Sequence, residues 1–128
     1  MKILGIGVDV IQNKRVKSLI NNKSFINRTF GKNELKNAKK FSDKTNYFAK
    51  RFAAKESLAK SLGTGFRNNL NFKDIEILND KIGKPYFSKS KKINNIIIKK
   101  FKVRKYDLFL SITDEKEYSV AFTILQSR

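Results

Sequence analysis

Residues Arg51–Gly65 read RFAAKESLAKSLGTG, a run with helical spacing that ends in two glycines around a threonine. At about 100° per residue, Glu56 falls inside the apolar arc of this helix rather than opposite it. The arc consists of Phe48, Ala49, Phe52, Ala59 and Leu62. A buried carboxylate has to be paired, protonated or bound to a metal ion. We therefore expect a helix from its cap Asp43 to Leu62 that carries a site for an anion–metal complex.

Two residues of this run also have purely structural explanations. Glu56 and Lys60 lie four residues apart, so they could form an ion pair on one helix face and nothing more. Gly63 is the residue type that most often ends a helix. The apolar surroundings of Glu56 favour a ligand role for it, whereas both explanations stay open for Gly63.

The composition limits the chemistry that the chain can perform. It has 128 residues with no cysteine and no histidine, which excludes disulfides, thiolate zinc sites and the usual general base. Any metal ion must therefore be bound by oxygen. A domain of this size buries about two-thirds of its unfolded surface but rarely contains a deep cleft, so an active site could require a neighbouring subunit.

The formal net charge of +18 would ordinarily indicate a nucleic-acid-binding protein. Lysine far outnumbers arginine, however, and asparagine and isoleucine are also abundant, a bias typical of A/T-rich coding. The charge is therefore weak evidence for one ligand. It still predicts that an acidic partner or a polyphosphate would be attracted at long range.

The N-terminal stretch Met1–Ile11 is apolar for only a few residues and already contains Asp9. It is neither a signal peptide nor a membrane span, and no later apolar run is long enough to be one. We expect a cytoplasmic protein with no membrane partner and one domain over residues 1–128.

Residues 3–11 alternate as a half-buried strand does. One face carries Leu4, Ile6, Val8 and Val10. The other carries only Gly5, Gly7 and Asp9, so a second backbone or a ligand could approach it closely. A glycine bulge followed by an aspartate that caps the next helix explains the pattern equally well.

The remaining pattern predicts an α+β domain, in which a small antiparallel sheet packs with the long helix and shorter helices. Helices are expected at residues 13–20, 31–41 and 88–101, and strands at 72–79, 108–112 and 118–124. Turns are expected at residues 79–85 and 114–117, the second of which joins the last two strands as a hairpin.

Asp9 and Glu56 are hard oxygen donors far apart in sequence, as in a Mg²⁺ site that substrate phosphates complete. Lys55 and Lys60 could neutralise phosphate oxygens, and Arg51 could bind two of them at once. Backbone amides at residues 63–65 could add donors. The residues thus favour phosphoryl transfer.

Four segments together resemble the holo-[acyl-carrier-protein] synthase family of 4'-phosphopantetheinyl transferases. They are Gly5–Asp9, Arg51–Gly65, Asp74–Tyr86 and Ser111–Ala121. The resemblance runs nearly end to end and implies transfer of 4'-phosphopantetheine from coenzyme A to a serine of apo-acyl carrier protein, in fatty acid biosynthesis. Adenosine 3',5'-bisphosphate would be released.

The resemblance also implies roles for individual residues. Asp9 and Glu56 would bind Mg²⁺, and these two with Lys60 would be catalytic. The coenzyme A phosphates would be bound by Lys60, Gly63, Thr64 and Gly65, with Arg51 and Lys55 nearby and Lys44 at the 3'-phosphate. Positioning and charge neutralisation suffice for such a transfer. The group that accepts the serine proton stays open; without histidine, a metal-bound water and a carboxylate are the candidates to consider.

Members of the family are similar in forming homotrimers with coenzyme A between subunits, which implies an inactive monomer. The acidic helix of acyl carrier protein would dock on residues 13–20. Its contacts would be Arg15, with Leu19 beneath it and Lys14, Lys17 and Arg28 around it. Complementary charge should mainly speed the encounter. Many relatives carry a histidine where this chain has Asp114, so a cationic contact to the 3'-phosphate is absent or supplied elsewhere.

Two other classes of protein remain as alternatives. A small basic RNA-binding module without catalysis would use the lysines and aromatics, but the phenylalanines have core-like spacings rather than those of an open stacking face. These are Phe48, Phe52, Phe109 and Phe122. A non-catalytic interaction protein would explain the charge but not the placement of Asp9 and Glu56.

Overall fold

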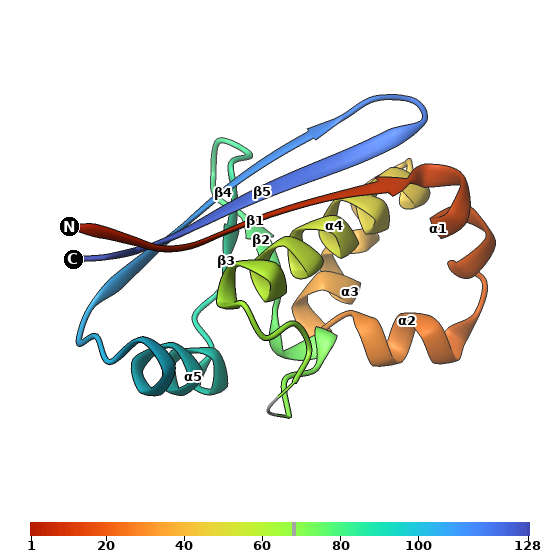
Figure 1. Cartoon of the computed structure of the whole chain (residues 1–128). Coiled ribbons are helices and arrows are strands. Elements are labelled where there is room, and N and C mark those ends of the chain that lie inside the picture. Colours follow the sequence, from red (N-terminus) through yellow and green to blue (C-terminus); the bar gives the residue numbers. More distant parts are fainter. Residues whose placement is uncertain (68) are drawn as a thin grey trace.

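The computed structural model describes residues 1–67 and 69–128. Its centre is an antiparallel sheet in the order β1 (Lys2–Gln12), β5 (Tyr118–Ser127) and β4 (Tyr106–Asp114). The long helix α4 (Lys44–Leu62) runs along one face of this sheet (Figure 1). The α+β class and the long helix are therefore confirmed.

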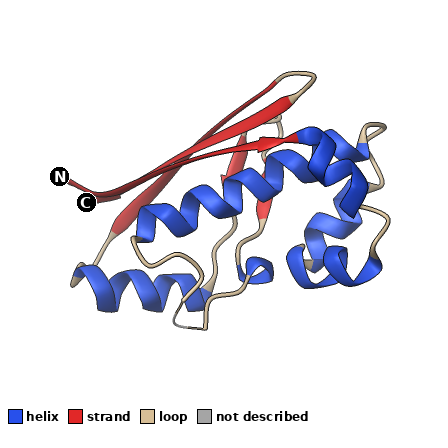
Figure 2. Ribbon diagram, turned by 45° about the vertical axis from the view of Figure 1, so that its right-hand side comes forward, coloured by secondary structure: helices blue, strands red, loops and turns tan. Residues whose placement is uncertain are grey.

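The shorter elements gather at the two ends of α4 and below it. They are α1 (Asn13–Leu19), α2 (Lys23–Thr29), α3 (Lys32–Ala38), the 3-10 turn η1 (Phe72–Asp74), β2 (Ile77–Asn79), β3 (Pro85–Phe87) and α5 (Lys91–Phe101). Figure 2 shows α1, α2 and α3 clustered at one end, and α5 at the other end beside the chain termini. Among the described residues, no helix is both long and apolar enough to cross a membrane.

Two local predictions were wrong. Residues 72–79 were expected to be one strand, but Asp74 accepts a hydrogen bond from the backbone of Asn71 at 2.8 Å and closes the η1 turn first. Only β2 is extended, and it pairs with β3, part of which was expected in a turn. The prediction also missed α2, whose cap Asn22 accepts from the Phe25 amide at 3.1 Å.

The glycine face of β1 is the face that helix α4 covers. A Cβ atom on Gly5 would overlap the carbonyl oxygen of Ser61, and one on Gly7 would overlap that of Ser57. The neighbouring strand β5 has a small side chain at this position too. Its Thr123 lies opposite Gly7, and the Thr123 hydroxyl forms a hydrogen bond of 2.6 Å with the hydroxyl of Ser57. The predicted close approach of a second backbone to this face is thus confirmed, and that backbone is α4.

The apolar face of the sheet is exposed. Ile6, Val8 and Val10 are 62, 56 and 61% exposed, and Phe109 and Phe122 are 49 and 41% exposed. The expectation that these phenylalanines belong to the core was wrong, because α4 packs against the opposite face. Cross-strand pairs such as Val8 with Phe122 join these side chains into one surface, which we call the open sheet face.

On its other side, α4 packs on a core of aromatic and aliphatic residues that contains a buried ion pair. Lys55 Nζ lies 2.6 Å from Glu34 Oε1, and both side chains are fully buried. Glu34 also accepts from the amides of Gly31 and Ile77, each at 3.0 Å. Burial raises the pKa of Glu34 and lowers the pKa of Lys55, and their mutual attraction opposes both shifts. This pair ties α3 and β2 to the long helix.

We expect Glu34→Gln to lower the free energy of unfolding by about 3–5 kcal/mol, because it leaves the Lys55 ammonium buried without a counter-charge. Chemical denaturation measures the loss. Lys92→Met is the matched control, since its ion pair with Asp74 is partly exposed and should contribute at most about 1 kcal/mol. Equal losses in the two variants would contradict a structural role for the buried pair.

Candidate active site

The structure brings Asp9, Glu56 and Lys60 together where β1 lies on α4. Lys60 Nζ is 3.1 Å from Asp9 Oδ1 and 3.0 Å from the carbonyl oxygen of Val8. The Lys60 side chain is 54% exposed and that of Asp9 is 15% exposed, so the group opens to solvent on the lysine side. Residues from opposite halves of the chain thus form one polar site.

Glu56 is half-buried, and its pKa is raised mainly by this burial and further by the negative charge of Asp9, while Lys60 opposes the shift. Asp9 and Glu56 therefore lie close enough for their charges to interact, with Lys60 as a nearby exposed cation. Such a donor set suits a divalent cation of the oxygen-preferring kind. Within residues 1–67 and 69–128 no third acidic residue joins them, so water and ligand oxygens would have to complete the shell.

The structure does not support the purely local explanations for Glu56 and Asp9, namely an ion pair within one helix and a helix cap. Lys60 forms its ion pair with Asp9 on the neighbouring strand rather than with Glu56 one helical turn away. Asp9 lies within β1 opposite Ala121, and the residue at the cap of α1 is Gln12, whose side chain makes no capping bond. Neither carboxylate is thereby explained by local helix formation.

Gly63 ends α4 in the left-handed conformation with φ of 77°. Its amide donates to the Lys60 carbonyl at 3.0 Å, and the Gly65 amide donates to the Ala59 carbonyl at 3.2 Å. The amides of Gly63 and Gly65, two of the three expected to bind phosphate, are thus already used in hydrogen bonds at the C-terminal end of α4. The Thr64 amide has no partner within the part of the chain that the structure describes, so it is the donor left for a ligand.

Lys55 and Arg51 do not lie at this site, which corrects their predicted contact with phosphate. Lys55 is fully buried and donates to Glu34 and to two backbone carbonyls. Arg51 is 3% exposed, lies 3.7 Å from the centre of the Tyr47 ring and donates to the side chain of Asn79. Burial lowers the pKa of Arg51. Both cations are close to Glu56 in sequence, but their side chains lie on another face of α4 and point into the core.

Lys44 lies at the other end of α4, about 18 Å from Glu56 at the helical rise. Its ammonium donates to the carbonyl of Phe41. Next to it Asn46 donates to the Asp114 carboxylate of the β4–β5 turn at 2.7 Å. Within one chain, therefore, Lys44 is close to the turn that contains Asp114 and far from the acidic pair. The contact of Asn46 with this turn had no signal in the sequence.

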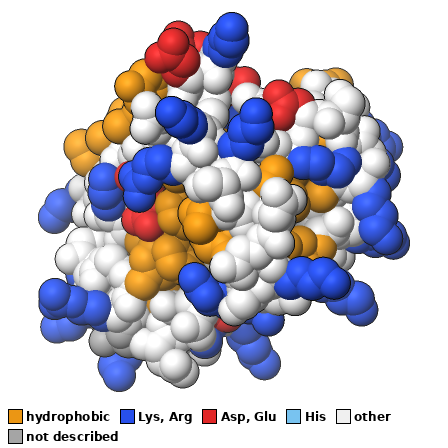
Figure 3. Space-filling view, turned by 90° about the vertical axis from the view of Figure 1, so that its right-hand side faces the viewer, with side chains coloured by type: hydrophobic (Ala, Val, Ile, Leu, Met, Phe, Trp, Pro, Cys, Tyr) orange, Lys and Arg blue, Asp and Glu red, His pale blue; other side chains and the backbone are white. Residues whose placement is uncertain are grey.

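The basic residues predicted to bind a partner lie on the α1–α2 end of the molecule. Lys14, Arg15 and Lys17 are exposed on α1, and Leu19 is half-buried beneath them. Arg28 is exposed on α2, 5.8 Å from the centre of the Phe25 ring. Figure 3 shows Lys and Arg side chains around partly exposed apolar groups on this side of the molecule.

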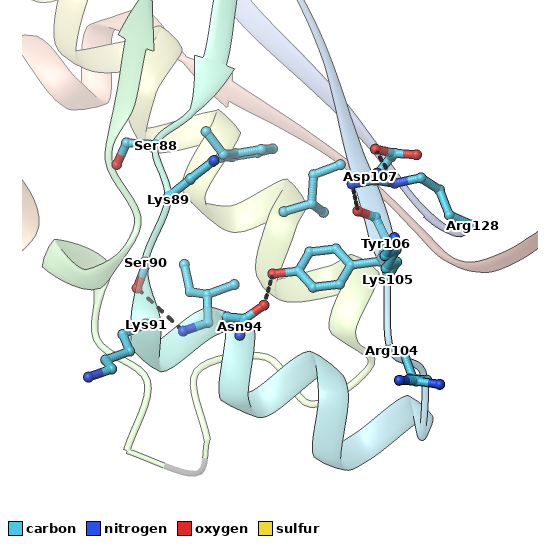
Figure 4. A pocket seen from close by; sticks show the side chains of 13 residues that line it. Ser88, Lys89, Ser90, Lys91, Asn94, Arg104, Lys105, Tyr106, Asp107 and Arg128 are labelled. Carbon is cyan, nitrogen blue, oxygen red and sulfur yellow. Dashed lines mark hydrogen bonds and ion pairs between the residues drawn. The ribbon is translucent and has the colours of Figure 1, made fainter.

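A separate cavity of about 590 Å³ lies between α5 and the start of β4 (Figure 4). In it the Tyr106 hydroxyl donates to Asn94 at 2.9 Å, and Arg128 pairs with Asp107 at 3.0 Å. No residue predicted for the active site lines this cavity. It is therefore not part of the site around Asp9 and Glu56.

Comparison with known proteins places this geometry in a class. The model of the 4'-phosphopantetheinyl transferase superfamily matches residues 5–123. This range includes both carboxylates, Lys60 and the β4–β5 turn. The fold and the site thus define a transferase of this superfamily.

Individual relatives narrow the assignment. A holo-[acyl-carrier-protein] synthase from Pelagibacter ubique is 53% identical over 128 residues, the full length of both chains. The crystal structure of the synthase from Neisseria meningitidis superposes with a TM-score of 0.87 at 33% identity, over 98% of this chain and 99% of that one. A Bacillus anthracis synthase in complex with CoA (3',5'-ADP) gives a TM-score of 0.82 at 35% identity over the whole of both chains. The chain belongs to the holo-[acyl-carrier-protein] synthase family, which confirms the resemblance inferred from its motifs.

We expect Asp9→Asn to lower the pKa of Glu56, because it removes a negative charge beside that carboxylate, but not below the ordinary value of 4.5, because burial is the larger cause. Carbon-detected NMR titration of the metal-free protein measures this pKa. The folded chain keeps the Glu56 proton to a higher pH than the unfolded chain does, so the free energy of unfolding falls as the pH rises from 4.5 through the raised pKa. Asp9→Asn should make this fall smaller. An unchanged pKa would mean that the two carboxylates lie too far apart to share an ion.

Proposed function

We propose that this chain transfers the 4'-phosphopantetheine group of coenzyme A to a serine of apo-acyl carrier protein, with release of adenosine 3',5'-bisphosphate. The observation that carries the proposal is the meeting of Asp9, Glu56 and Lys60 where β1 lies on α4. Relatives named holo-[acyl-carrier-protein] synthase and the Bacillus anthracis complex with CoA support it. We place the activity in fatty acid biosynthesis and in the cytoplasm, performed by one domain over residues 1–128.

Asp9 and Glu56 would hold Mg²⁺, which when bound supplies positive charge to the diphosphate of coenzyme A. Lys60 is exposed and flexible enough to turn from Asp9 to a phosphate oxygen. The Thr64 amide donates to the same phosphates, while Gly63 and Gly65 shape the loop that presents it. The residues of the chain thus bind and orient the reacting phosphorus, and the carrier's serine supplies the nucleophile.

The assembly is proposed to be a homotrimer with active sites between subunits. The open sheet face carries Ile6, Val8 and Val10 beside Phe109 and Phe122, an apolar surface of the kind that a protein interface covers. A neighbouring subunit would also bring a second Lys44 and Asp114 toward the acidic pair. Lys44 lies too far along α4 to reach the acidic pair within one chain, and Asp114 at the end of β4 lies beside Asn46 at the same end of that helix, so the 3'-phosphate contact is assigned to the neighbour.

Acyl carrier protein is proposed to dock on α1 through the exposed cations Lys14, Arg15 and Lys17, with Leu19 beneath and Arg28 at the side. An acidic helix would find complementary charge here. The RNA-binding alternative is less favoured, because the aromatics of the open sheet face lie among aliphatic residues rather than among the lysines that an RNA backbone needs.

We expect Glu56→Gln to reduce transfer at least about a hundredfold, because it removes a charge that neutralises the reacting centre but keeps the size of the side chain. Mass spectrometry of apo-acyl carrier protein incubated with coenzyme A and Mg²⁺ detects the added phosphopantetheine group. The control Asp107→Asn removes a carboxylate at the opposite end of the molecule and should leave the rate unchanged. An unmodified carrier with the unaltered protein, together with salt-dependent RNA binding, would favour the RNA-binding module instead.

We expect Phe122→Lys to yield folded monomers without transferase activity, because it places a charge in the centre of the open sheet face. Sedimentation velocity measures the assembly and circular dichroism checks the fold. The control Ile98→Lys, on a half-exposed position of α5, should leave the assembly intact. A Phe122→Lys variant that is monomeric and fully active would contradict sites shared between subunits.

A further inference from the structure

Asn13, the first residue of α1, ties this helix to the turn between β4 and β5. Its backbone amide donates to the Glu117 carbonyl at 2.8 Å, and its side-chain Nδ2 donates to the carbonyls of Glu115 and Lys116 at 3.0 and 3.2 Å. Its Oδ1 accepts from the Ser119 hydroxyl at 2.8 Å. Asn13 is only 6% exposed, so these bonds replace water for nearly every polar group of its side chain.

This arrangement does not serve the helix in the usual way. An asparagine at the start of a helix ordinarily caps the amides of that helix, whereas the side chain of Asn13 bonds a turn about a hundred residues away along the chain. A helix of seven residues is too short to be stable alone in water. The position of α1 therefore depends on its anchors, and Asn13 is a polar anchor among the described residues.

The turn has a second, independent attachment. Asp114 accepts from Asn46 of α4 at 2.7 Å, and this bond does not involve Asn13. Loss of the Asn13 side-chain bonds would thus loosen α1 from the Glu115 and Lys116 carbonyls, while the Glu115 amide still donates to the Tyr118 carbonyl and Asp114 stays in place. A hollow of about 640 Å³ at this junction is lined by Lys14 and Lys17 of α1 and by Lys116 and Glu117 of the turn, with Asp43 also in its wall. The tether therefore holds the cations of α1 in a fixed place beside a turn of mixed charge.

We propose that Asn13 is a positioning residue for the carrier protein, which holds α1 against the Glu115–Glu117 turn so that the exposed cations of α1 meet an acidic partner already ordered. The proposal rests on the docking of acyl carrier protein on α1 given above. An ordered surface binds more tightly because less conformational entropy is lost on association. Asn13 contacts neither substrate itself, and its effect should appear in the use of the carrier and not in the chemical step.

The test is the kinetics of Asn13→Asp in the full assembly, since the new carboxylate cannot donate and would face two backbone carbonyls. We expect the KM for acyl carrier protein to rise about three- to tenfold, the range for one or two lost hydrogen bonds. The kcat and the KM for coenzyme A should stay within about twofold. Hydrogen exchange should quicken at residues 13–19 and 115–118 but not in α4.

Ser119→Ala is the matched control, because it removes a buried hydrogen bond of the same asparagine but keeps both bonds to the turn. Its KM for the carrier should stay near that of the unaltered protein. An equal rise in both variants, or a fall in kcat as large as the rise in KM, would overturn the positioning role and leave a structural one. Arg15→Glu distinguishes failure of the positioning role of Asn13 from failure of carrier docking on α1. If it raises the carrier KM and Asn13→Asp does not, only this proposal fails, whereas no effect of either variant rejects docking on α1 itself.

Discussion

The close packing of the β1 backbone on helix α4 is the constraint on which the rest of the structure depends. Gly5 and Gly7 leave no space between strand and helix for a Cβ atom, since one would overlap the carbonyls of Ser61 and Ser57. This contact sets the distance between β1 and α4 where Asp9 stands beside Glu56 and Lys60. A larger residue at either glycine would push the two elements apart and separate the carboxylates, although neither glycine touches a ligand.

The same packing determines what the sheet can offer to a partner. Because α4 occupies the face with small residues, the side chains of the open sheet face point outward and stay exposed. A chain of this size cannot both bury that surface and enclose a large cofactor. A second copy would do both, since it would cover the apolar face and bring the far end of its own α4 near the acidic pair. The fold, the proposed assembly and the proposed active site are thus linked by one choice of packing face.

Periodicity in the sequence predicted which residues share a face but not what covers that face. It correctly paired Gly5 and Gly7 with Asp9 and placed Ile6, Val8 and Val10 on one face. Leu4, expected on that face, instead packs against the core beside a register shift of β1, and the expectation that Phe109 and Phe122 belong to the core was also wrong. The same limit applies to Lys55 and Arg51. They are neighbours of Glu56 in sequence, but α4 is buried on several sides, and its second buried face contains the Glu34 ion pair, which depends on residues far away in the chain. The acidic pair was predictable because each carboxylate breaks an apolar or bare pattern. Asn13 was not, because an asparagine at a helix start has an ordinary local explanation.

The net charge of the molecule gives a reason for the two carboxylates of the proposed site. With a net charge of +18, the surface attracts phosphates and acidic proteins from a distance without further help. Such attraction is not selective, however, and it does not fix a phosphate oxygen in one place. Asp9 and Glu56 place two negative charges together, and the charge of Asp9 adds to the burial that raises the pKa of Glu56. If they hold Mg²⁺ as proposed, a diphosphate would be accepted here only with a divalent cation, and the acidic pair would convert general attraction into selection.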